Sequence, residues 1–295
     1  MATVKEIRNR IKSIQSTEKI TRAMKMVASV KFRKAQQNVV SARPYAKKLN
    51  NILKNLIPSL EEFDNELLKE REVKKICLVV VSSDRGLCGS FNTNLIKHAA
   101  NTIIEKYGEY SGNHNLTLIT IGKKAYDFFY KRHYDIYARY INVFDKLEFS
   151  AAEKIINEII KGYIEKKFDK VVVIYNEFKS VVQSKIVEDQ LLPIAAFEDS
   201  TGSIGNIANY IYEPTSNEIV NALLPRHLNT QMWQVMLESY ASEQAARMTA
   251  MDSATTNAND LVRELNLTYN RARQAAITKE LLEVVAGAEA LSESN

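Results

Sequence analysis

The feature that most limits the fold of this chain is a helical pattern of about 70 residues near its C-terminal end. The pattern extends from Ser216 to Ala286, and no glycine interrupts it before Gly287. At 1.5 Å per residue, a helix of that size is about 105 Å long. Because no domain of 295 residues can bury such a rod by itself, we expect this helix to pair with another one.

The pairing partner is expected at the other end of the chain. Apolar residues recur at intervals of three and four, so residues 4–57 are interpreted as one helix, which Pro44 bends or weakens and Pro58 ends. Helices at both ends predict a long antiparallel coiled coil. The inner side of the last helix is rich in small residues, which permit close packing. It includes Ala241, Ala245, Met248, Ala254, Ala258, Leu261 and Leu265.

Between the two helices, apolar β-branched runs alternate with helical stretches. The runs "KKICLVVV", "NLTLITI" and "DKVVVIY" are typical of strands buried on both faces. The alternation predicts a central Rossmann-like α/β domain with parallel pairing. The expected strands are 74–81, 115–121 and 169–175, the expected helices are 90–107, 122–133 and 150–167, and two further, antiparallel strands are expected at 179–194 and 207–214.

These patterns divide the chain into four predicted parts. The N-terminal coiled-coil helix takes residues 1–57, and a charged connector takes 58–73. The central α/β domain spans 74–213, and the C-terminal coiled-coil helix spans 214–295. The fold class is therefore α/β, with a long antiparallel coiled coil added to it.

Charge is unevenly distributed along the chain. The net charge is only +5, yet residues 1–54 carry fourteen Lys and Arg against two acids, Glu6 and Glu18. A nucleic-acid arm would carry more aromatic residues than Phe32 and Tyr45, and a membrane-surface helix would carry a bulky apolar face. The small and flexible apolar face of this helix instead favours a protein partner.

The sequence offers little for catalysis. "SSDRGLCGSFNTN" (82–94) lies between a strand and a helix, where a phosphate-binding loop occurs, but it lacks the lysine and spacing of known motifs. The four histidines share no metal-ligand spacing, and Cys77 and Cys88 form no CxxC pair. We therefore expect no catalytic residue, no cofactor and no metal. Neither a membrane-spanning run nor a secretory signal is expected.

Three stretches resemble the γ subunits of rotary F-type ATP synthases. They are "IRNRIKSIQSTEKITRAMKMVASVKFRKAQ" (7–36), "SSDRGLCGSFN" (82–92) and the C-terminal helix from "YEPTSNEIVNALLPRHL" (212–228) through "ESYASEQAARMTAMDSATTNA" (238–258) to "NRARQAAITKELLEVVAGAEAL" (270–291). The last contains the signature I-T-x-E-x-x-E-x-x-x-G-A. The resemblance covers essentially the whole chain, with variable spacing at 55–75 and 108–116.

The resemblance implies a rotor rather than an enzyme in its own right. The coiled coil would lie inside a ring of three α and three β subunits, and the α/β domain would contact the ε subunit and the ring of c subunits. Proton or sodium flow would turn the c-ring and this chain with it, one copy per complex. The nucleotide sites would belong to the partners.

The resemblance also suggests residues for partner contact. Arg85 and Lys25 would face an acidic loop of β, and Arg273 with Gln274 would bind a loop of the catalytic subunits. Positions implicated in coupling are occupied by Met24, Arg247, Gln274 and Thr278.

The location implied is the cytoplasmic face of a bacterial plasma (inner) membrane, reached peripherally. The helical pattern begins by Val4, which leaves no room for a long transit peptide, and the chain lacks the cysteine-bearing insert of chloroplast relatives. Two other classes remain open from the residues alone: a nucleic-acid-binding coiled coil and an isolated α/β nucleotide-binding enzyme.

Overall fold

A computed structural model describes residues 3–57, 65–181, 183–194, 213 and 215–293. The chain forms two compact units, one of residues 1–28 with 248–295 and one of residues 29–247. The boundary crosses both terminal helices, α1 (Val4–Leu56) and α5 (Ser216–Glu293), so each unit contains a part of each helix. The division of the chain into four parts by element type stays a prediction.

The terminal helices begin where local hydrogen bonds satisfy their first N–H groups. Thr3 and Glu6 form a reciprocal capping box before α1, because each side chain accepts the backbone N–H of the other. The Thr215 hydroxyl accepts the N–H of Glu218 at the start of α5. Pro44 lies inside α1 without ending it, and α5 continues past Gly287 to Glu293. Pro58, the expected end of α1, lies outside the described residues.

A five-stranded sheet forms the centre of the larger unit, in the order β3-β2-β1-β4-β5. The β1–β2, β2–β3 and β1–β4 pairs are parallel, and the β4–β5 pair is antiparallel. The strands are β1 (Ile76–Val81), β2 (Leu116–Ile121), β3 (Ile136–Tyr140), β4 (Lys170–Phe178) and β5 (Ser184–Leu192).

The predicted sheet is confirmed at its centre and incomplete at one edge. The three apolar runs form β1, β2 and β4, and the antiparallel strand expected in 179–194 is β5. β3 was missed because "IYARY" is short and only half-buried, so it lacks a continuous apolar run. The strand expected at 207–214 lies almost entirely outside the described residues.

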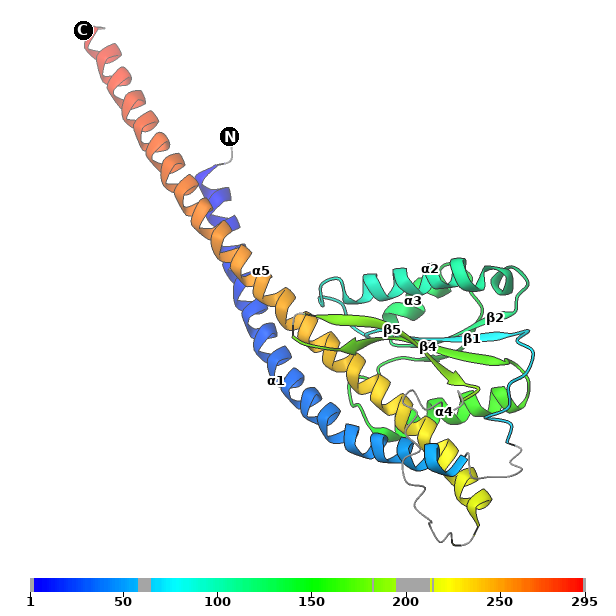
Figure 1. Ribbon diagram of the computed structural model, residues 1–295. Helices are drawn as coiled ribbons and strands as arrows, with labels where there is room; N and C mark the ends of the chain where they lie inside the picture. Colours follow the sequence, from blue (N-terminus) through cyan, green and yellow to red (C-terminus); the bar gives the residue numbers. More distant parts are fainter. Residues whose placement is uncertain (1–2, 58–64, 182, 195–212, 214, 294–295) are drawn as a thin grey trace. The chain divides into compact units, whose positions relative to one another are not determined.

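Helices cover both faces of this sheet, as Figure 1 shows. On one face lie α2 (Phe91–Gly112) and α3 (Lys123–Tyr130), and on the other lies α4 (Phe149–Ile164). The predicted helices are thus confirmed with shifted ends. Alternate residues of β1 point to opposite layers, so Leu78 packs with the α2–α3 side and Val79 with the α4 side.

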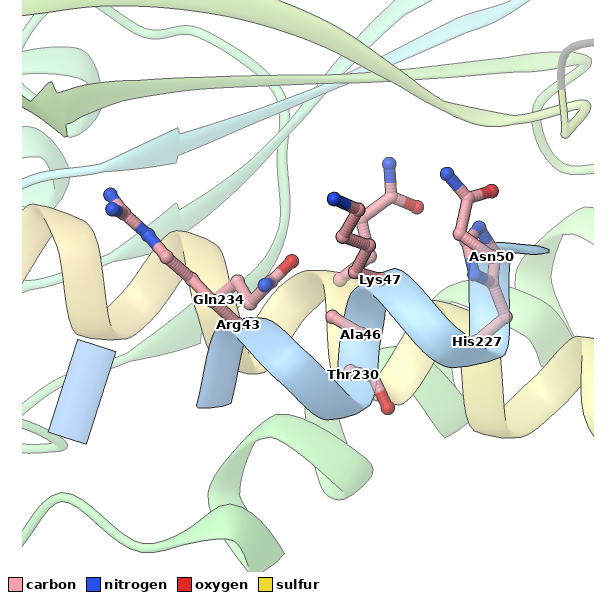
Figure 2. Close-up of a pocket in the computed structure, with 8 residues that line it drawn as sticks. Arg43, Ala46, Lys47, Asn50, His227, Thr230 and Gln234 are labelled. Carbon is pink, nitrogen blue, oxygen red and sulfur yellow. The ribbon is translucent and has the colours of Figure 1, made fainter. Parts of the chain in front are cut away.

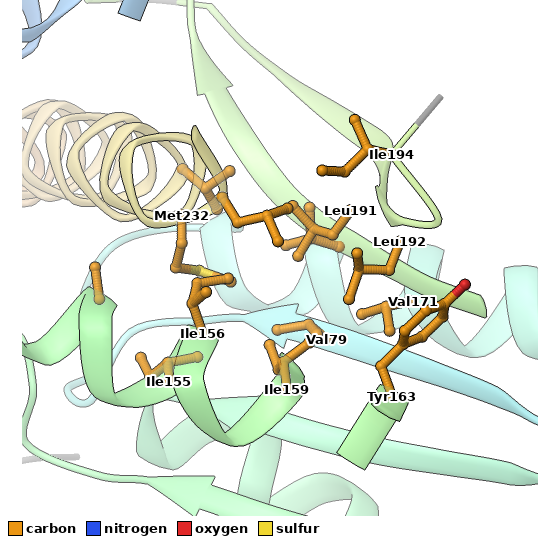
Figure 3. Close-up of a cluster of buried hydrophobic side chains, with 14 of the residues drawn as sticks. Val79, Ile155, Ile156, Ile159, Tyr163, Val171, Leu191, Leu192, Ile194 and Met232 are labelled. Carbon is orange, nitrogen blue, oxygen red and sulfur yellow. The ribbon is translucent and has the colours of Figure 1, made fainter. Parts of the chain in front are cut away.

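The larger core lies on the α4 side and includes the first turns of α5 (Figure 3). Ile155, Ile156 and Ile159 of α4 lie against Val79 and Met232, all of them buried. Fully burying one such side chain stabilises the fold by roughly 1.5–3 kcal/mol. The α5 residues that contribute to this core include Val220, Leu224, Leu228, Met232, Val235 and Met236.

Within the larger unit, α1 and α5 are packed together through small side chains. Ala35 and Val39 of α1 form a buried cluster with Leu237 and Ala241 of α5. Ala241 is completely buried, which indicates a short distance between the two helices. A long antiparallel helix pair combined with a Rossmann-like α/β domain is the fold class predicted from the sequence, and it is confirmed.

Candidate functional site

In the smaller unit, α1 and α5 are joined by a narrow seam. The hydroxyls of Thr21 and Thr255 share a buried hydrogen bond of 2.7 Å. Ala28, Met251 and Ala258 are also buried. Ile7 and Ile11 are buried nearer the start of α1. The buried residues of this unit are few, so each helix keeps most of its surface exposed.

Lys25 forms an ion pair inside the chain. Its ammonium lies 2.5 Å from Oδ1 of Asp252, and the two side chains are 40% and 56% exposed. Exposed pairs of this kind contribute little to stability. Lys25 is therefore accessible to another acidic group, but only in competition with Asp252. The neighbouring Met24 is half-buried.

Large apolar side chains remain exposed on the outer surface of the smaller unit. On α1, Ile20, Met26 and Val27 are more than half exposed. On α5, the exposed set comprises Leu261, Leu267, Ile277, Leu281, Leu282, Val284 and Val285. A row of exposed aliphatic side chains on a helix is typical of a surface that contacts another protein.

Arg273, Gln274 and Thr278 lie together on one stretch of α5 and are all exposed. The Thr278 hydroxyl donates to the backbone carbonyl of Gln274 at 3.0 Å. Among the described residues, Arg273 makes no ion pair. The structure therefore leaves the Arg273 guanidinium and the Gln274 amide available to a group outside the chain.

The loop after β1 is held by an unusually dense set of internal bonds. Asp84 is buried, and its carboxylate accepts the backbone N–H groups of Lys123, Asn142 and Phe144. One side chain thus connects the segments that follow β1, β2 and β3. Ser82 Oγ additionally accepts the N–H of Ala125 at 2.9 Å.

Gly122 is required by the close approach of these segments. Its φ is +92°, and a Cβ atom there would lie 2.2 Å from the carbonyl oxygen of Ser82. The loop after β1, which lies where a phosphate-binding loop can occur, is therefore used to join the strand ends to one another.

Arg85 points away from this bonded loop. Its guanidinium lies 2.8 Å from Asp145 and its side chain is 73% exposed. Leu87, two residues later, is 65% exposed and adopts a φ of +62°. A bulky side chain strains the backbone at positive φ, and exposing an apolar side chain to water is also unfavourable. Sequence reasoning identified Arg85 but missed Leu87, whose exposure depends on the shape of the folded loop.

Arg247 is placed differently from the other predicted residues. It lies 2.5 Å from Glu243 one turn earlier in α5, and both side chains are almost fully buried. Its Nη2 also donates to the carbonyl oxygen of Gly86 at 3.2 Å. Within this chain, Arg247 therefore connects α5 to the loop after β1.

Burial governs the titration of the groups around Arg247. It raises the pKa of Glu243, and the nearby Asp84 carboxylate adds to this rise while Arg247 opposes it. Burial also raises the pKa of the Cys88 thiol. Cys77 and Cys88 are both free and buried, so neither has the exposed thiolate that redox chemistry needs. Glu243 was not singled out from the sequence, although its spacing of four from Arg247 was visible.

A pocket of about 440 Å³ lies between α1 and α5 in the larger unit (Figure 2). Arg43 and Lys47 come from α1, while His227 and Gln234 come from α5. Burial lowers the pKa of His227, which favours its neutral form. Arg43 lies 3.7 Å from Glu238, whose pKa is raised by burial. The pocket brings together amide and basic groups but no nucleophile with an adjacent base.

No set of three His, Cys, Asp or Glu side chains in the described ranges is arranged to hold a metal ion. Over the same part of the chain, none of the helices combines the length and the apolar character of a membrane-spanning segment.

Comparison with known proteins gives one consistent family. The family model described as ATP synthase matches residues 3–291. The gamma chain of ATP synthase from Chloroherpeton thalassium is 50% identical over 303 aligned positions, which cover all of both chains. That of Prosthecochloris aestuarii is 51% identical over 292 positions, which cover 99% of each chain.

Solved structures share the fold at lower identity. A chain in the F1/c-ring structure of the Euglena gracilis mitochondrial ATP synthase superposes with a TM-score of 0.72 at 20% identity, covering 98% of this chain and 94% of that one. A chain of the rotor from the same organism gives a TM-score of 0.66 at 19% identity, with coverage of 93% and 98%.

Proposed function

Because the chain belongs to the ATP synthase family and, within it, to the gamma chains, we propose that it acts as the central rotor shaft of an F-type ATP synthase. In this role it couples rotation of an ion-driven c-ring to conformational changes at the catalytic β subunits, for synthesis or hydrolysis of ATP. The chain is part of an enzyme complex, and its own contribution is mechanical, with the nucleotide sites on its partners.

The observation that carries this proposal is the surface of the smaller unit. Its two helices bury few side chains, which are Ile7, Ile11, Thr21, Ala28, Met251, Thr255 and Ala258, and they leave long aliphatic side chains exposed. A rotor has to pass several similar partner surfaces without binding one of them too tightly. Flexible and small apolar side chains such as Met26 and Val27 suit that task because they pack adaptably.

The basic groups provide the second component of the partner contact. Arg85 extends from a firmly bonded loop and, with Leu87 beside it, would meet an acidic loop of β. Lys25 would exchange Asp252 for a partner carboxylate. Met24 lies next to Lys25 at the same contact. Such charges steer an approach at long range without fixing a single position.

Three further residues are assigned to the catalytic ring. Arg273 and Gln274 would form hydrogen bonds with a loop of the catalytic subunits in some rotary positions, and Thr278 would support Gln274 from the next turn. Arg247 would act indirectly, since its side chain holds the loop that presents Arg85.

The proposed partners are the α3β3 ring, the ε subunit and the c-ring, with one copy of this chain per complex. The proposed location is the cytoplasmic face of the bacterial plasma membrane, with peripheral association through the membrane sector. No cofactor, metal or nucleic acid is assigned to the chain.

Affinity purification of the tagged chain from solubilised membranes tests the proposal. We expect α, β and ε subunits in one stable, ATP-hydrolysing complex. A nucleic-acid-binding coiled coil would instead bind DNA or RNA with a steep salt dependence, and a nucleotide-binding enzyme would turn over ATP as the purified single chain. Recovery of the chain without these subunits would contradict the proposal.

A further inference from the structure

A second pocket lies on the opposite side of the sheet from α4, between α2 and α3. It encloses about 610 Å³ and lies wholly within the larger unit. Figure 1 shows the two helices side by side over this face of the sheet. Ile96 and Phe128 form part of an apolar wall. Nothing in the proposed rotor function requires a pocket here.

Four cations line this pocket against one acid. Lys97 comes from α2, Lys124 and Lys131 come from α3 and its C-terminal end, and Arg132 follows directly. Asp127 is the only carboxylate among the lining residues. In the described part of the chain, none of the four cations forms an ion pair, whereas Lys106, also on α2, pairs with Glu188. Four cations repel one another and a single carboxylate, Asp127, cannot balance them, so this cluster favours an anion from outside.

Arg132 is oriented before any ligand arrives. Its guanidinium carbon lies 3.6 Å from the centre of the Phe128 ring, and its Nη1 donates to the Phe128 carbonyl at 3.3 Å. Stacking on an aromatic ring fixes the orientation of the guanidinium plane. The remaining N–H groups of the fork have no acceptor among the described residues, and a fork of this kind matches two oxygens of a phosphate.

We propose that this pocket binds a phosphate-bearing anion, either a free phosphate compound or the headgroup of an anionic phospholipid. The hollow is of the size of a small ligand, and an acidic helix would need cations spread along a groove rather than gathered around one cavity. Phosphate concentrates its charge on a compact group, which suits cations such as Lys97, Lys131 and Arg132 that line one cavity. The apolar wall at Ile96 and Phe128 would receive the uncharged part of an organic phosphate.

The test uses the full-length purified chain and inorganic pyrophosphate as the probe, with isothermal titration calorimetry at low ionic strength. We expect saturable binding with one site per chain. Replacing both exposed lysines, Lys97→Gln with Lys131→Gln, should weaken this binding at least tenfold while the far-ultraviolet circular dichroism stays unchanged. Absence of saturable binding by the parental chain overturns the proposal.

A matched control separates the pocket from the general positive charge of the protein. Lys154 and Lys166 are exposed residues of the same unit and lie outside the pocket. The variant Lys154→Gln with Lys166→Gln removes the same charge and should bind pyrophosphate like the parent. Equal losses in the two variants overturn the proposal, and so does displacement of pyrophosphate by polyglutamate of the same total charge.

A vesicle experiment then distinguishes the two sources of phosphate. Vesicles of phosphatidylglycerol and phosphatidylcholine are compared with vesicles of phosphatidylcholine alone by sedimentation with the full-length chain. Binding to the anionic vesicles that pyrophosphate displaces and that the pocket variant loses supports a lipid headgroup. Pyrophosphate binding without vesicle binding supports a free phosphate compound. Both experiments use the single chain, so their failure leaves the rotor function untouched.

Discussion

At the scale of single residues, Glu243 and Arg247 form the most deeply buried ion pair among the described residues of the larger unit. Both side chains are almost entirely removed from water. Arg247 also donates to the loop after β1. Removing one partner leaves an uncompensated charge in a place where water cannot reach it, which is far more costly than losing an exposed pair.

Arg247→Ala is therefore expected to lower the free energy of unfolding by about 3–5 kcal/mol at neutral pH. The loss should depend on pH. Burial already raises the pKa of Glu243 above 4.5 and Arg247 opposes that rise, so the variant raises this pKa further. A carboxyl whose pKa is raised in the folded chain binds more protons there than in the unfolded chain. The destabilisation that it causes therefore grows as the pH rises above its pKa in the unfolded chain.

Urea unfolding of the full-length chain between pH 5 and pH 8 measures this dependence. The difference between parent and Arg247→Ala should be smaller at the acidic end and larger at the alkaline end. The double variant Glu243→Gln with Arg247→Ala lacks the Glu243 carboxylate and serves as the control. A difference that is constant across the range would show that Glu243 is not the titrating group.

At the scale of elements, the helices were predictable and their contacts only in part. The period of apolar residues in 4–57 and the long run from Ser216 gave α1 and α5, because such patterns are local. β3 could not be recognised, since its residues become half-buried only when β2 and the segment after it are in place. Likewise, the spacing of Glu243 and Arg247 was visible, but their burial depends on the loop after β1.

Gly162 of α4 lies in a helix, where alanine is normally more favourable than glycine, but the packing at this position leaves no room for a Cβ atom. A Cβ atom at this position would lie 2.4 Å from Cζ of Phe168, a fully buried ring. We expect Gly162→Ala to destabilise the protein by about 1–3 kcal/mol, because the core around Phe168 has to shift. Thermal and urea unfolding measure the effect.

The matched control is Gly108 of α2, where an added Cβ meets nothing within 4 Å. Gly108 directly follows Tyr107, whose backbone is not helical. Gly108→Ala should therefore leave stability unchanged or raise it by at most about 1 kcal/mol, since alanine loses less backbone entropy on folding. A neutral or stabilising Gly162→Ala would contradict the packing of α4 against Phe168.

The packing of α1 against α5 in the larger unit supports a similar prediction. Ala241 is completely buried against Ala35 and Val39. Ala241→Leu inserts three carbon atoms into this contact and should cost about 1–3 kcal/mol of unfolding free energy. Ala275, an exposed alanine of the same helix, provides the control, and Ala275→Leu should stay within about 0.5 kcal/mol of the parent. Equal effects at the two positions would mean that Ala241 is not enclosed.

At the scale of the whole molecule, the fold class and the family were predictable, whereas the roles of single residues were not. Long motifs such as 7–36 and 238–258 identified the family from the sequence. The sequence did not indicate that Arg247 binds the loop after β1 through the Gly86 carbonyl or that Lys25 is paired with Asp252. These contacts join residues that are far apart in the sequence, so no local pattern predicts them.

The proposed roles of Arg273 and Gln274 concern the assembled complex. Both are exposed on α5, so Arg273→Ala with Gln274→Ala should leave the unfolding free energy of the chain unchanged. In the complex we expect a clear fall in ATP turnover, because each hydrogen bond to a charged group contributes roughly 1.5–3 kcal/mol. Steady-state ATPase activity of the purified complex measures this. Arg271→Ala, a neighbouring exposed arginine of the same helix, controls for the loss of charge.

Complexes that assemble and turn over ATP at the parental rate after the double substitution would exclude these residues from the contact with the catalytic subunits. The family assignment would be unaffected, because it depends on the match over residues 3–291.

The bonds of Asp84 have a consequence for how force passes through the molecule. A loop can transmit force between subunits only if it deforms less than the sheet from which it extends. The Asp84 carboxylate connects the loop that carries Arg85 to the backbone N–H groups of Lys123, Asn142 and Phe144 by hydrogen bonds. A push on Arg85 is thereby shared among the ends of three neighbouring strands instead of being absorbed by bending of one loop. In the proposed role, a force that a partner exerts on Arg85 would therefore reach the sheet with little bending of the loop.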